Sequence, residues 1–269
     1  MKFAILGSTV MLGSAVGKYF IEKYGEDNVF LSYRNEEVSY GKNKFYFDAN
    51  DSDIGCIPDC DYIINCIGTI KPFMCENMCK SIFLNSVFPL KLSHYSPVMT
   101  KVIHITTDCV FSGKKGAYTE EDFHDAEDEY GKSKSLGEIC QKECMVIRTS
   151  IIGEEIHKKA SLIEWIKSQK GKKTNGYINH LWNGITTKQY AKVCSKIIDE
   201  NLYEEGLFHV FSNVVNKLEL VTYVNEKFNL DIDINPFEAP ISCDRTMSTI
   251  KDLNENLNIP SIKDQIIDL

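Results

Sequence analysis

Short apolar segments alternate with segments of helical spacing through the first 150 residues, and this alternation constrains the fold more than any other feature. Helical spacing covers residues 12–24, residues 73–96 with a break at Pro89, and residues 129–142. The apolar segments between them are predicted strands, at 2–6, 28–33, 44–47, 62–67, 101–106 and 144–148. Apolar strands that alternate with helices are typical of a parallel sheet covered on both faces. The sequence therefore predicts an α/β fold with a doubly wound parallel sheet.

The pattern changes after Arg148. Helices are predicted at 161–169, 186–200, 217–228, 248–253 and after Pro260, and strands at 207–211 and 231–235. Thr186 or Thr187 is the expected N-cap of the second of these helices. A polar, glycine-containing stretch fills 170–184. We expect one domain over 1–150 and a smaller lobe over 151–269, with the chain returning to the first domain near 186–212.

Composition narrows the function classes. The net charge of −8 and the pI of about 5.4 disfavour a non-specific nucleic-acid binder, which needs a positive surface. No apolar run reaches the ~18 residues of a membrane span, and the chain opens directly into a strand without a signal-peptide pattern. We therefore expect a cytoplasmic protein whose ten cysteines are reduced. The pairs Cys56/Cys60 and Cys75/Cys79 lack the usual zinc spacing, so no metal is expected.

A glycine-containing turn follows the first strand and opens the first helix. Gly7 permits a tight turn and Gly13 permits close helix–strand packing, although Val10 stands where the usual dinucleotide pattern has a glycine. A pyrophosphate would bind at the helix N-terminus. The residues expected to border it are Gly7, Ser8, Thr9, Met11, Leu12 and Gly13.

The ends of the next two strands indicate which cofactor is preferred. Arg34 follows the second strand, where a carboxylate would bind the ribose 2′-hydroxyl of NAD and an arginine can accept a 2′-phosphate. Glu36 and Glu37 come later and would reverse the preference if they turned toward the ribose. Asp48 ends the third strand and is expected at the same edge. NADPH is predicted as the cofactor, with NADH as the alternative.

Tyrosine, lysine and threonine are predicted to meet at the carboxyl edge of the sheet. Tyr130 and Lys134 share one helix face because they are four residues apart. Thr107 and Asp108 follow the fifth strand. A cation lowers the pKa of a neighbouring tyrosine, which can then exchange a proton near neutral pH.

In these residues and their order along the chain, the sequence resembles the extended short-chain dehydrogenases/reductases. More narrowly, it resembles the dTDP-4-dehydrorhamnose reductase group of nucleotide-sugar reductases. The match is collinear through most of the chain. The segments that carry it are GSTVMLGS (7–14), DYIINCIG (61–68), Asn85, TTDCVFSG (106–113), YTEED (118–122), YGKSKSLGE (130–138), VIRTS (146–150), WNGITTKQYAKV (182–193), GLFHVFSNVVNKLEL (206–220) and DRTM (244–247).

The resemblance implies a Rossmann domain and a catalytic role for three residues. Tyr130 would protonate the carbonyl oxygen, Lys134 would hold the nicotinamide ribose and lower the tyrosine pKa, and Thr107 would bind the substrate oxygen. Further residues would border the cofactor or support the site: Asn65, Cys66, Gly68 and Asn85. Asp108 would lie beside the substrate, and Cys109 replaces an aromatic residue that the family often has there.

The second lobe is expected to cover the sugar nucleotide. Candidate contacts are Asn179, Trp182, Asn183 and Arg245, the last as a bidentate ligand of the diphosphate. The resemblance implies reduction of the 4-keto group of a 4-keto-6-deoxy nucleotide-sugar, for surface polysaccharide, by a homodimer. Alternatives are a dehydratase, which usually has a glutamate at the position of Cys109, and an epimerase/reductase, which would recruit Cys109 or His180. A further alternative is a non-catalytic, cofactor-binding regulatory subunit, such as the one attached to methionine adenosyltransferase.

Overall fold

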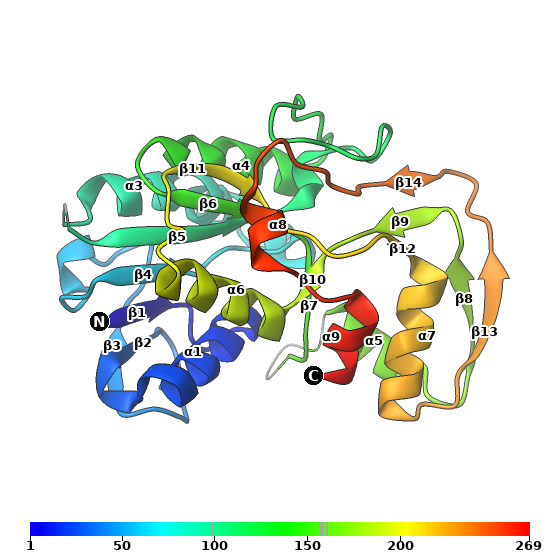
Figure 1. Cartoon of the computed structure of the whole chain (residues 1–269), viewed down its shortest axis with the longest axis horizontal. Helices are drawn as coiled ribbons and strands as arrows, with labels where there is room; N and C mark the ends of the chain where they lie inside the picture. Colours follow the sequence, from blue (N-terminus) through cyan, green and yellow to red (C-terminus); the bar gives the residue numbers. More distant parts are fainter. Residues whose placement is uncertain (98, 156–158, 160) are drawn as a thin grey trace.

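The computed structural model describes residues 1–97, 99–155, 159 and 161–269. Its centre is a parallel sheet of seven strands in the order β11-β6-β5-β4-β1-β2-β3 (Figure 1). These strands are β1 (Phe3–Leu6), β2 (Val29–Tyr33), β3 (Asn43–Tyr46), β4 (Tyr62–Asn65), β5 (Lys101–Thr106), β6 (Met145–Arg148) and β11 (Gly206–His209). The strand order reverses between β1 and β4, which is where ligands bind in such sheets.

The strands are apolar on both faces because helices cover both faces. In β1, Phe3 and Ile5 pack on one side, whereas Ala4 and Leu6 pack on the other. The first side is covered by α1 (Met11–Tyr24) and α6 (Thr187–Asp199), which contact each other. The opposite side is covered by α2 (Met78–Ile82), α3 (Phe88–Tyr95) and α4 (Glu129–Gly137). The predicted doubly wound parallel sheet is confirmed.

The elements other than the large sheet and the helices that cover it form a second cluster with its own core, on the right of Figure 1. Its apolar residues come from helices and from strands that pair in twos and threes, among them Ile163, Trp182 and Val224. The strands are β7 (Ile151–Ile152), β8 (Lys173–Tyr177), β9 (His180–Trp182), β10 (Ile185–Thr186), β12 (Val215–Asn216), β13 (Asp233–Phe237) and β14 (Cys243–Asp244). The helices are α5 (Leu162–Ser168), α7 (Lys217–Phe228) and α9 (Ile262–Ile267). The short helix α8 (Leu253–Leu257) instead packs Leu253 and Leu257 into the core beside α1 and α6. Within the described ranges, no helix has both the length and the apolar character needed to cross a bilayer.

Pro89 does not break its helix, contrary to the sequence prediction. A π-helical segment, Phe83–Val87, joins α2 to α3, and the Phe88 N–H donates to the Phe83 carbonyl five residues back. Proline lacks an N–H and its ring clashes with the carbonyl four residues earlier in an α-helix. The wider π segment directly before Pro89 removes that conflict, so the helix continues to Tyr95.

The predicted helix at 248–253 is wrong, because hydrogen bonds to Glu120 hold this segment outside a helix. The Glu120 carboxylate accepts hydrogen bonds from Thr249 Oγ1 (2.6 Å) and from the Ile250 N–H (3.1 Å). The helix α8 starts only at Leu253.

The polar stretch 170–184 contains two strands that the sequence pattern did not reveal. One of them, β8, pairs in parallel with β13, which starts two residues later than expected. Thr186 is the N-cap of α6, as predicted, and its side chain accepts from the Gln189 N–H.

Candidate active site at the carboxyl edge of the sheet

The turn after β1 is shaped to bring an anion against the start of α1. Gly7 has a φ of 81°, in the left-handed region that favours glycine. A Cβ atom on Gly13 would lie 2.0 Å from the Gly7 carbonyl oxygen, so only glycine lets the helix begin this close to the strand. Val10 has an extended backbone, with a φ of −100°, so its position does not require glycine. The first turn of α1 has no side-chain cap and no acidic residue, which leaves its N–H groups to an anion such as a dinucleotide pyrophosphate.

The other predicted residues of this turn divide between surface and core. Thr9 and Met11 are partly exposed, whereas Ser8 is fully buried and donates to the Ile5 carbonyl. Leu12 is buried in the core below the sheet edge. Ser32, in β2, was missed by the sequence analysis, and its Oγ accepts from the Gly7 N–H at 2.8 Å. It therefore holds the glycine turn in place.

Arg34 and Asp48 lie near each other beyond the ends of β2 and β3. Arg34 is exposed. Hydrogen bonds from Asn50 and the nearby Arg34 charge outweigh burial and keep the pKa of Asp48 below its usual value. The Glu37 carboxylate forms an ion pair with the Lys44 ammonium at 3.7 Å.

The loop after β4 is fixed by two buried asparagines. Asn65 Nδ2 contacts His104 Nδ1 at 3.0 Å and its Oδ1 accepts from the Ile67 N–H. Asn85 binds the Thr69 backbone through both amide atoms and donates to Ser133 Oγ at 3.0 Å. The asparagines thus tie the loop to β5 and to α4. Cys66 is buried and Gly68 is exposed at the loop's edge.

Thr107, Asp108 and Cys109 lie together at the end of β5. Thr107 Oγ1 donates to Asp108 Oδ1 at 3.1 Å and accepts from the Cys109 N–H at 3.1 Å. Burial and the Asp108 charge raise the pKa of Cys109 to about 12. The side chain is therefore a neutral thiol near neutral pH.

Tyr130 and Lys134 face this strand end from α4. Burial raises the pKa of Tyr130 well above its usual value, the charge of Asp108 acts in the same direction, and a hydrogen bond with Thr107 opposes them. The pKa of Tyr130 is therefore raised rather than lowered as predicted, because burial is the largest influence on it. Burial lowers the pKa of Lys134 to about 8. A Cβ on Gly68 would lie 2.8 Å from Lys134 Nζ, so the glycine makes room for the ammonium.

Of the four predicted lobe residues, Arg245 contacts the segment that follows this edge. Arg245 Nε donates to the Phe111 carbonyl at 2.9 Å, and Phe111 follows Thr107 by four residues. Trp182 is buried, and Lys217 Nζ lies 5.1 Å from the centre of its indole ring. Lys217 was missed by the sequence analysis. The sequence feature that could have drawn attention to Lys217 is its place at the first position of a helix, where its charge opposes the helix dipole.

The side-chain amides of Asn179 and Asn183 are hydrogen-bonded to the backbone. Asn179 bonds both the N–H and the carbonyl of Ala239, and Asn183 does the same with Met247. These amides hold the C-terminal segment in place, so we do not include them in the proposed substrate site.

A buried polar cluster beside α4 was also missed. Arg148, fully buried, donates to Glu138 (Nε to Oε1, 3.0 Å) and contacts His209 Nε2 at 2.7 Å and His124 Nε2 at 2.6 Å. Its guanidinium also lies 4.8 Å from the centre of the Phe111 ring. These side chains come from separate segments of the chain, so no local sequence pattern predicted that they would meet.

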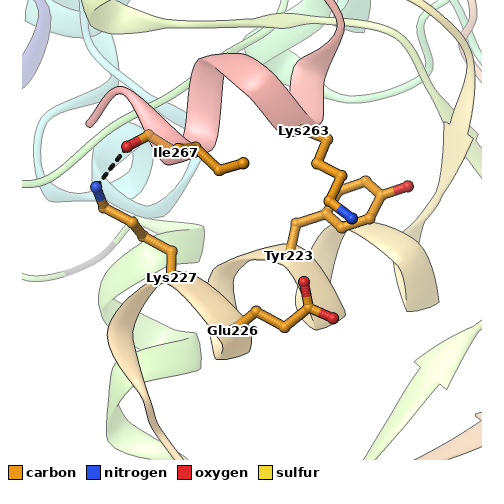
Figure 2. A pocket seen from close by; sticks show the side chains of 5 residues that line it. All are labelled: Tyr223, Glu226, Lys227, Lys263 and Ile267. Atoms are coloured by element: carbon orange, nitrogen blue, oxygen red, sulfur yellow. Dashed lines mark hydrogen bonds between the residues drawn. The ribbon is translucent and has the colours of Figure 1, made fainter.

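One recess lies away from these residues. It has a volume of about 300 Å³ between α7 and α9 and is lined by Tyr223, Glu226, Lys227, Lys263 and Ile267 (Figure 2). Another, of about 120 Å³, lies beside Ile57 and Thr100 near the amino ends of the strands. No group of three or more metal-ligating side chains occurs in the part of the chain that the structure describes, where all ten cysteines are free thiols.

Known proteins resemble this chain in sequence. The spore coat polysaccharide biosynthesis protein SpsK of Bacillus subtilis is 27% identical over 196 residues, covering 65% of this chain and 63% of that protein. Methionine adenosyltransferase 2 subunit beta of Rattus norvegicus is 28% identical over 141 residues, covering 48% of this chain and 42% of that protein. The chain thus matches about three fifths and two fifths of the length of these relatives.

Solved structures share the fold over nearly the whole chain. A hypothetical dTDP-4-dehydrorhamnose reductase from Sulfolobus tokodaii has a TM-score of 0.78 at 22% identity, covering 98% of this chain and 99% of that one. A dTDP-4-dehydrorhamnose reductase from Bacillus anthracis, in complex with NADP, has a TM-score of 0.74 at 17% identity, covering 99% and 97%. At these identities the likeness concerns the fold. The family model described as the RmlD substrate binding domain matches residues 1–251, and the chain therefore belongs to the RmlD substrate-binding domain family.

Proposed function

We propose that the protein is an NAD(P)H-dependent reductase of the 4-keto group of a 4-keto-6-deoxy nucleotide-sugar, acting in deoxysugar and surface polysaccharide biosynthesis. One observation supports this most: Thr107, Tyr130 and Lys134 meet at the sheet edge next to the glycine turn. Family membership supports the substrate class, and SpsK is named for spore coat polysaccharide biosynthesis.

The chain's own residues hold the ketone and supply the proton. Thr107 Oγ1 and Tyr130 Oη bind the carbonyl oxygen, and the raised pKa of Tyr130 keeps its proton in place until the oxygen becomes an alkoxide. The Tyr130 proton then passes to that oxygen. Lys134, with a pKa of about 8, is a proton source for the phenolate that remains. A bound nicotinamide would supply the hydride.

Several residues fit that cofactor. The N–H groups at the start of α1 bind its pyrophosphate, Lys134 beside Gly68 binds its ribose, and Arg34 binds a 2′-phosphate. NADP in the Bacillus anthracis structure and NAD in a structure named MoeE5 with UDP-glucose support a nicotinamide dinucleotide. We propose NADPH as the preferred form.

The alternatives lack an acid or base at the expected place. A dehydratase needs a second carboxylate where the chain has Cys109, and the thiol pKa of about 12 leaves no thiolate base for an epimerase. His180 Nε2 is engaged by the Ile241 carbonyl at 3.1 Å. A regulatory role like that of the methionine adenosyltransferase subunit would not require Thr107, Tyr130 and Lys134 together.

We further propose that residues 1–150 form the cofactor domain and that residues 151–269 mainly cover the sugar nucleotide, with the chain returning near 186–212. The pairing of β11 with β6 supports the return. A homodimer through helices that flank the sheet is part of the proposal.

A substrate screen tests the reaction. Purified protein is mixed with NADPH and with 4-keto-6-deoxy sugars linked to dTDP, UDP, GDP or CDP, and loss of the reduced-cofactor absorbance is followed. Turnover of at least one compound, with a 6-deoxyhexose nucleotide as product, is expected. Cofactor binding without turnover of any of them would favour the regulatory alternative.

A further inference from the structure

Helix α4 carries three polar side chains four residues apart, Tyr130, Lys134 and Glu138. Glu138 follows the last residue of α4 and keeps a helical backbone, so the three side chains are neighbours along one face. The proposed chemistry uses the first two. Glu138 is only 2% exposed, and a carboxylate in the interior is unfavourable unless it is paired. Its place one turn beyond Lys134 therefore calls for a physical reason.

The Glu138 carboxylate is fixed by Arg148, the last residue of β6. Oε1 accepts from Arg148 Nε at 3.0 Å and Oε2 accepts from Nη2, so the pair is bidentate. Arg148 is fully buried, and two histidines contact its guanidinium: His209 of β11 and His124. The other ring nitrogen of His124 contacts Ser135 Oγ of α4 at 2.6 Å. These contacts hold the carboxylate in one position relative to α4.

Glu138 is the carboxylate that acts on Lys134. Burial lowers the pKa of Lys134 to about 8, and the Glu138 charge is the strongest influence in the opposite direction. Burial also raises the pKa of Cys66 and lowers that of His104, so both are uncharged near neutral pH. The titratable groups that face Lys134 from α4 and from the elements around it are Tyr130, Glu138, Cys140, Cys66 and His104. Among them, Glu138 supplies the negative charge that favours the ammonium.

We propose that Glu138 is a positioning residue that keeps Lys134 in its ammonium form, and that Arg148 limits this effect by pairing with the carboxylate. The assignment rests on the proposed function, in which the Lys134 ammonium returns a proton to the Tyr130 phenolate. Because Lys134 titrates near pH 8, a modest change in the neighbouring charge decides how much of the ammonium is present there.

Two substitutions break the same ion pair but change the charge beside Lys134 in opposite directions. Glu138→Gln removes the carboxylate charge and leaves the Arg148 cation, so the pKa of Lys134 should fall by about one pH unit. Arg148→Met removes the cation and leaves the carboxylate, so the pKa of Lys134 should rise. A pair that only stabilises the fold would not shift the two variants in opposite directions.

NMR of the cofactor-free protein measures this charge without any turnover. The protein is produced with isotope-labelled lysine, and the Lys134 signal is identified by its loss in Lys134→Met. Its chemical shift is followed across the pH range in the wild type and in both variants. The wild type should titrate near pH 8, Glu138→Gln near about pH 7, and Arg148→Met above the wild type.

A double variant covers the case in which a single variant does not fold. Each single substitution leaves one buried charge unpaired, which destabilises a fold strongly, whereas removing both charges together is often tolerated. Glu138 acts on the Lys134 pKa more strongly than any other neighbouring charge. In the variant that combines Glu138→Gln with Arg148→Met, Lys134 should therefore still titrate below the wild type.

Glu120→Gln is the matched control. Glu120 contacts the same cluster from another side, where its carboxylate accepts from the His209 N–H at 3.0 Å, and it does not lie on α4. The substitution removes a carboxylate from the cluster but leaves the pair of Glu138 and Arg148 in place. Lys134 should titrate as in the wild type.

The pH dependence of turnover gives a second measurement where a 4-keto sugar is reduced. At about pH 6, Lys134 is protonated in both proteins, so kcat of Glu138→Gln relative to the wild type should be highest there. The relative kcat should be roughly fivefold lower at about pH 8, where half of the wild type but about a tenth of the variant has the ammonium.

The outcomes separate this role from the reductase proposal. An unchanged Lys134 titration in Glu138→Gln or in the double variant, or shifts in the same direction in the two single variants, overturns the role of Glu138. A relative kcat that does not vary with pH also overturns it and leaves the reductase proposal standing. Opposite titration shifts support the role of Glu138 even where no 4-keto sugar is reduced, a result that would contradict the reductase proposal alone.

Discussion

At the scale of single residues, the Tyr130 hydroxyl is the group on which the proposed chemistry depends. We expect Tyr130→Phe to lower kcat by about 10²–10⁴-fold, the usual worth of a general acid. The dissociation constant of NADPH should stay nearly unchanged, because the hydroxyl acts on the substrate oxygen. Steady-state kinetics and cofactor titration measure the two effects separately.

Tyr19→Phe is the control for this substitution, since Tyr19 lies on α1 and packs against the sheet core. It should leave kcat unchanged. A Tyr130→Phe enzyme that keeps more than about a tenth of the activity would mean that another group protonates the substrate.

Arg34 determines the cofactor preference in our proposal. It is exposed beside Asp48, so one carboxylate is already near it, and a 2′-phosphate would compete for the same guanidinium. A charge-assisted contact of this kind is worth roughly 1.5–3 kcal/mol. We therefore expect kcat/KM for NADPH to exceed that for NADH by about tenfold to a hundredfold, and Arg34→Ala to bring the two values together. A wild type that favours NADH, or an unchanged ratio in Arg34→Ala, would contradict this assignment.

At the scale of elements, the sequence predicted the strands and helices whose signal is local. The large sheet could be predicted because its strands are apolar on both faces. The pairs β8–β13 and β9–β14 could not, because their partners lie about 60 residues away and the strands are short and half-polar. The π segment before Pro89 depends on hydrogen bonding that residue types alone do not reveal.

In the candidate site, too, some residues could be placed from the sequence and others could not. The places of Thr107, Tyr130 and Lys134 follow from strand ends and from a four-residue spacing. Arg245 reaches that edge only because β14 pairs with the distant strand β9, which no local pattern contains.

The contact between β6 and β11 contains a histidine that must stay neutral. His209 Nε2 accepts from Arg148 Nη1 (2.7 Å) while its Nδ1–H donates to the Ser248 carbonyl (2.6 Å). Burial, followed by the Arg148 charge, lowers the pKa of His209 to about 4, against partial opposition from Glu120 and Glu138. His124, which also contacts Arg148, faces the same cluster.

This histidine makes stability depend on pH. Its folded-state pKa lies below that of the unfolded chain, near 6.5, so the unfolded chain takes up the proton more readily. Its stabilising contribution is complete above pH 6.5 and is lost as the pH falls toward 4. At about 1.4 kcal/mol per pH unit, the loss is on the order of 3 kcal/mol. Urea unfolding between pH 4 and 7 should record this slope, and His209→Gln should make it shallower. Burial also lowers the pKa of His104 and of His124, so these two histidines account for a remaining slope.

His94→Gln, at an exposed histidine of α3, is the control and should keep the slope of the wild type. If His209→Gln unfolds with the same pH dependence as the wild type, other groups are responsible for the acid sensitivity.

At the scale of the whole molecule, the two covered faces of the sheet differ. The face with α1 and α6 is closed further by α8 and the C-terminal segment. On the opposite face, α2, α3 and α4 form the outer layer, and large apolar side chains on them and on the turns that adjoin them are exposed. They are Ile82, Val87, Leu90, Leu136 and Ile139, each 39–54% exposed. An apolar patch on neighbouring helices is typical of a protein–protein interface.

We expect this patch to be where two copies of the chain associate, because a second copy offers the same apolar helices in an isologous contact. Light scattering coupled to size exclusion should give twice the 30.6 kDa of one chain for the wild type. The double substitution Leu90→Asp and Leu136→Asp places two buried charges in the interface of each protomer, so the variant should elute as a monomer with an unchanged circular dichroism spectrum. Ile241→Asp alters a side chain that is 81% exposed outside the sheet helices, and it should remain dimeric. A monomeric wild type, or a double variant that stays dimeric, would mean that these helices do not form the interface.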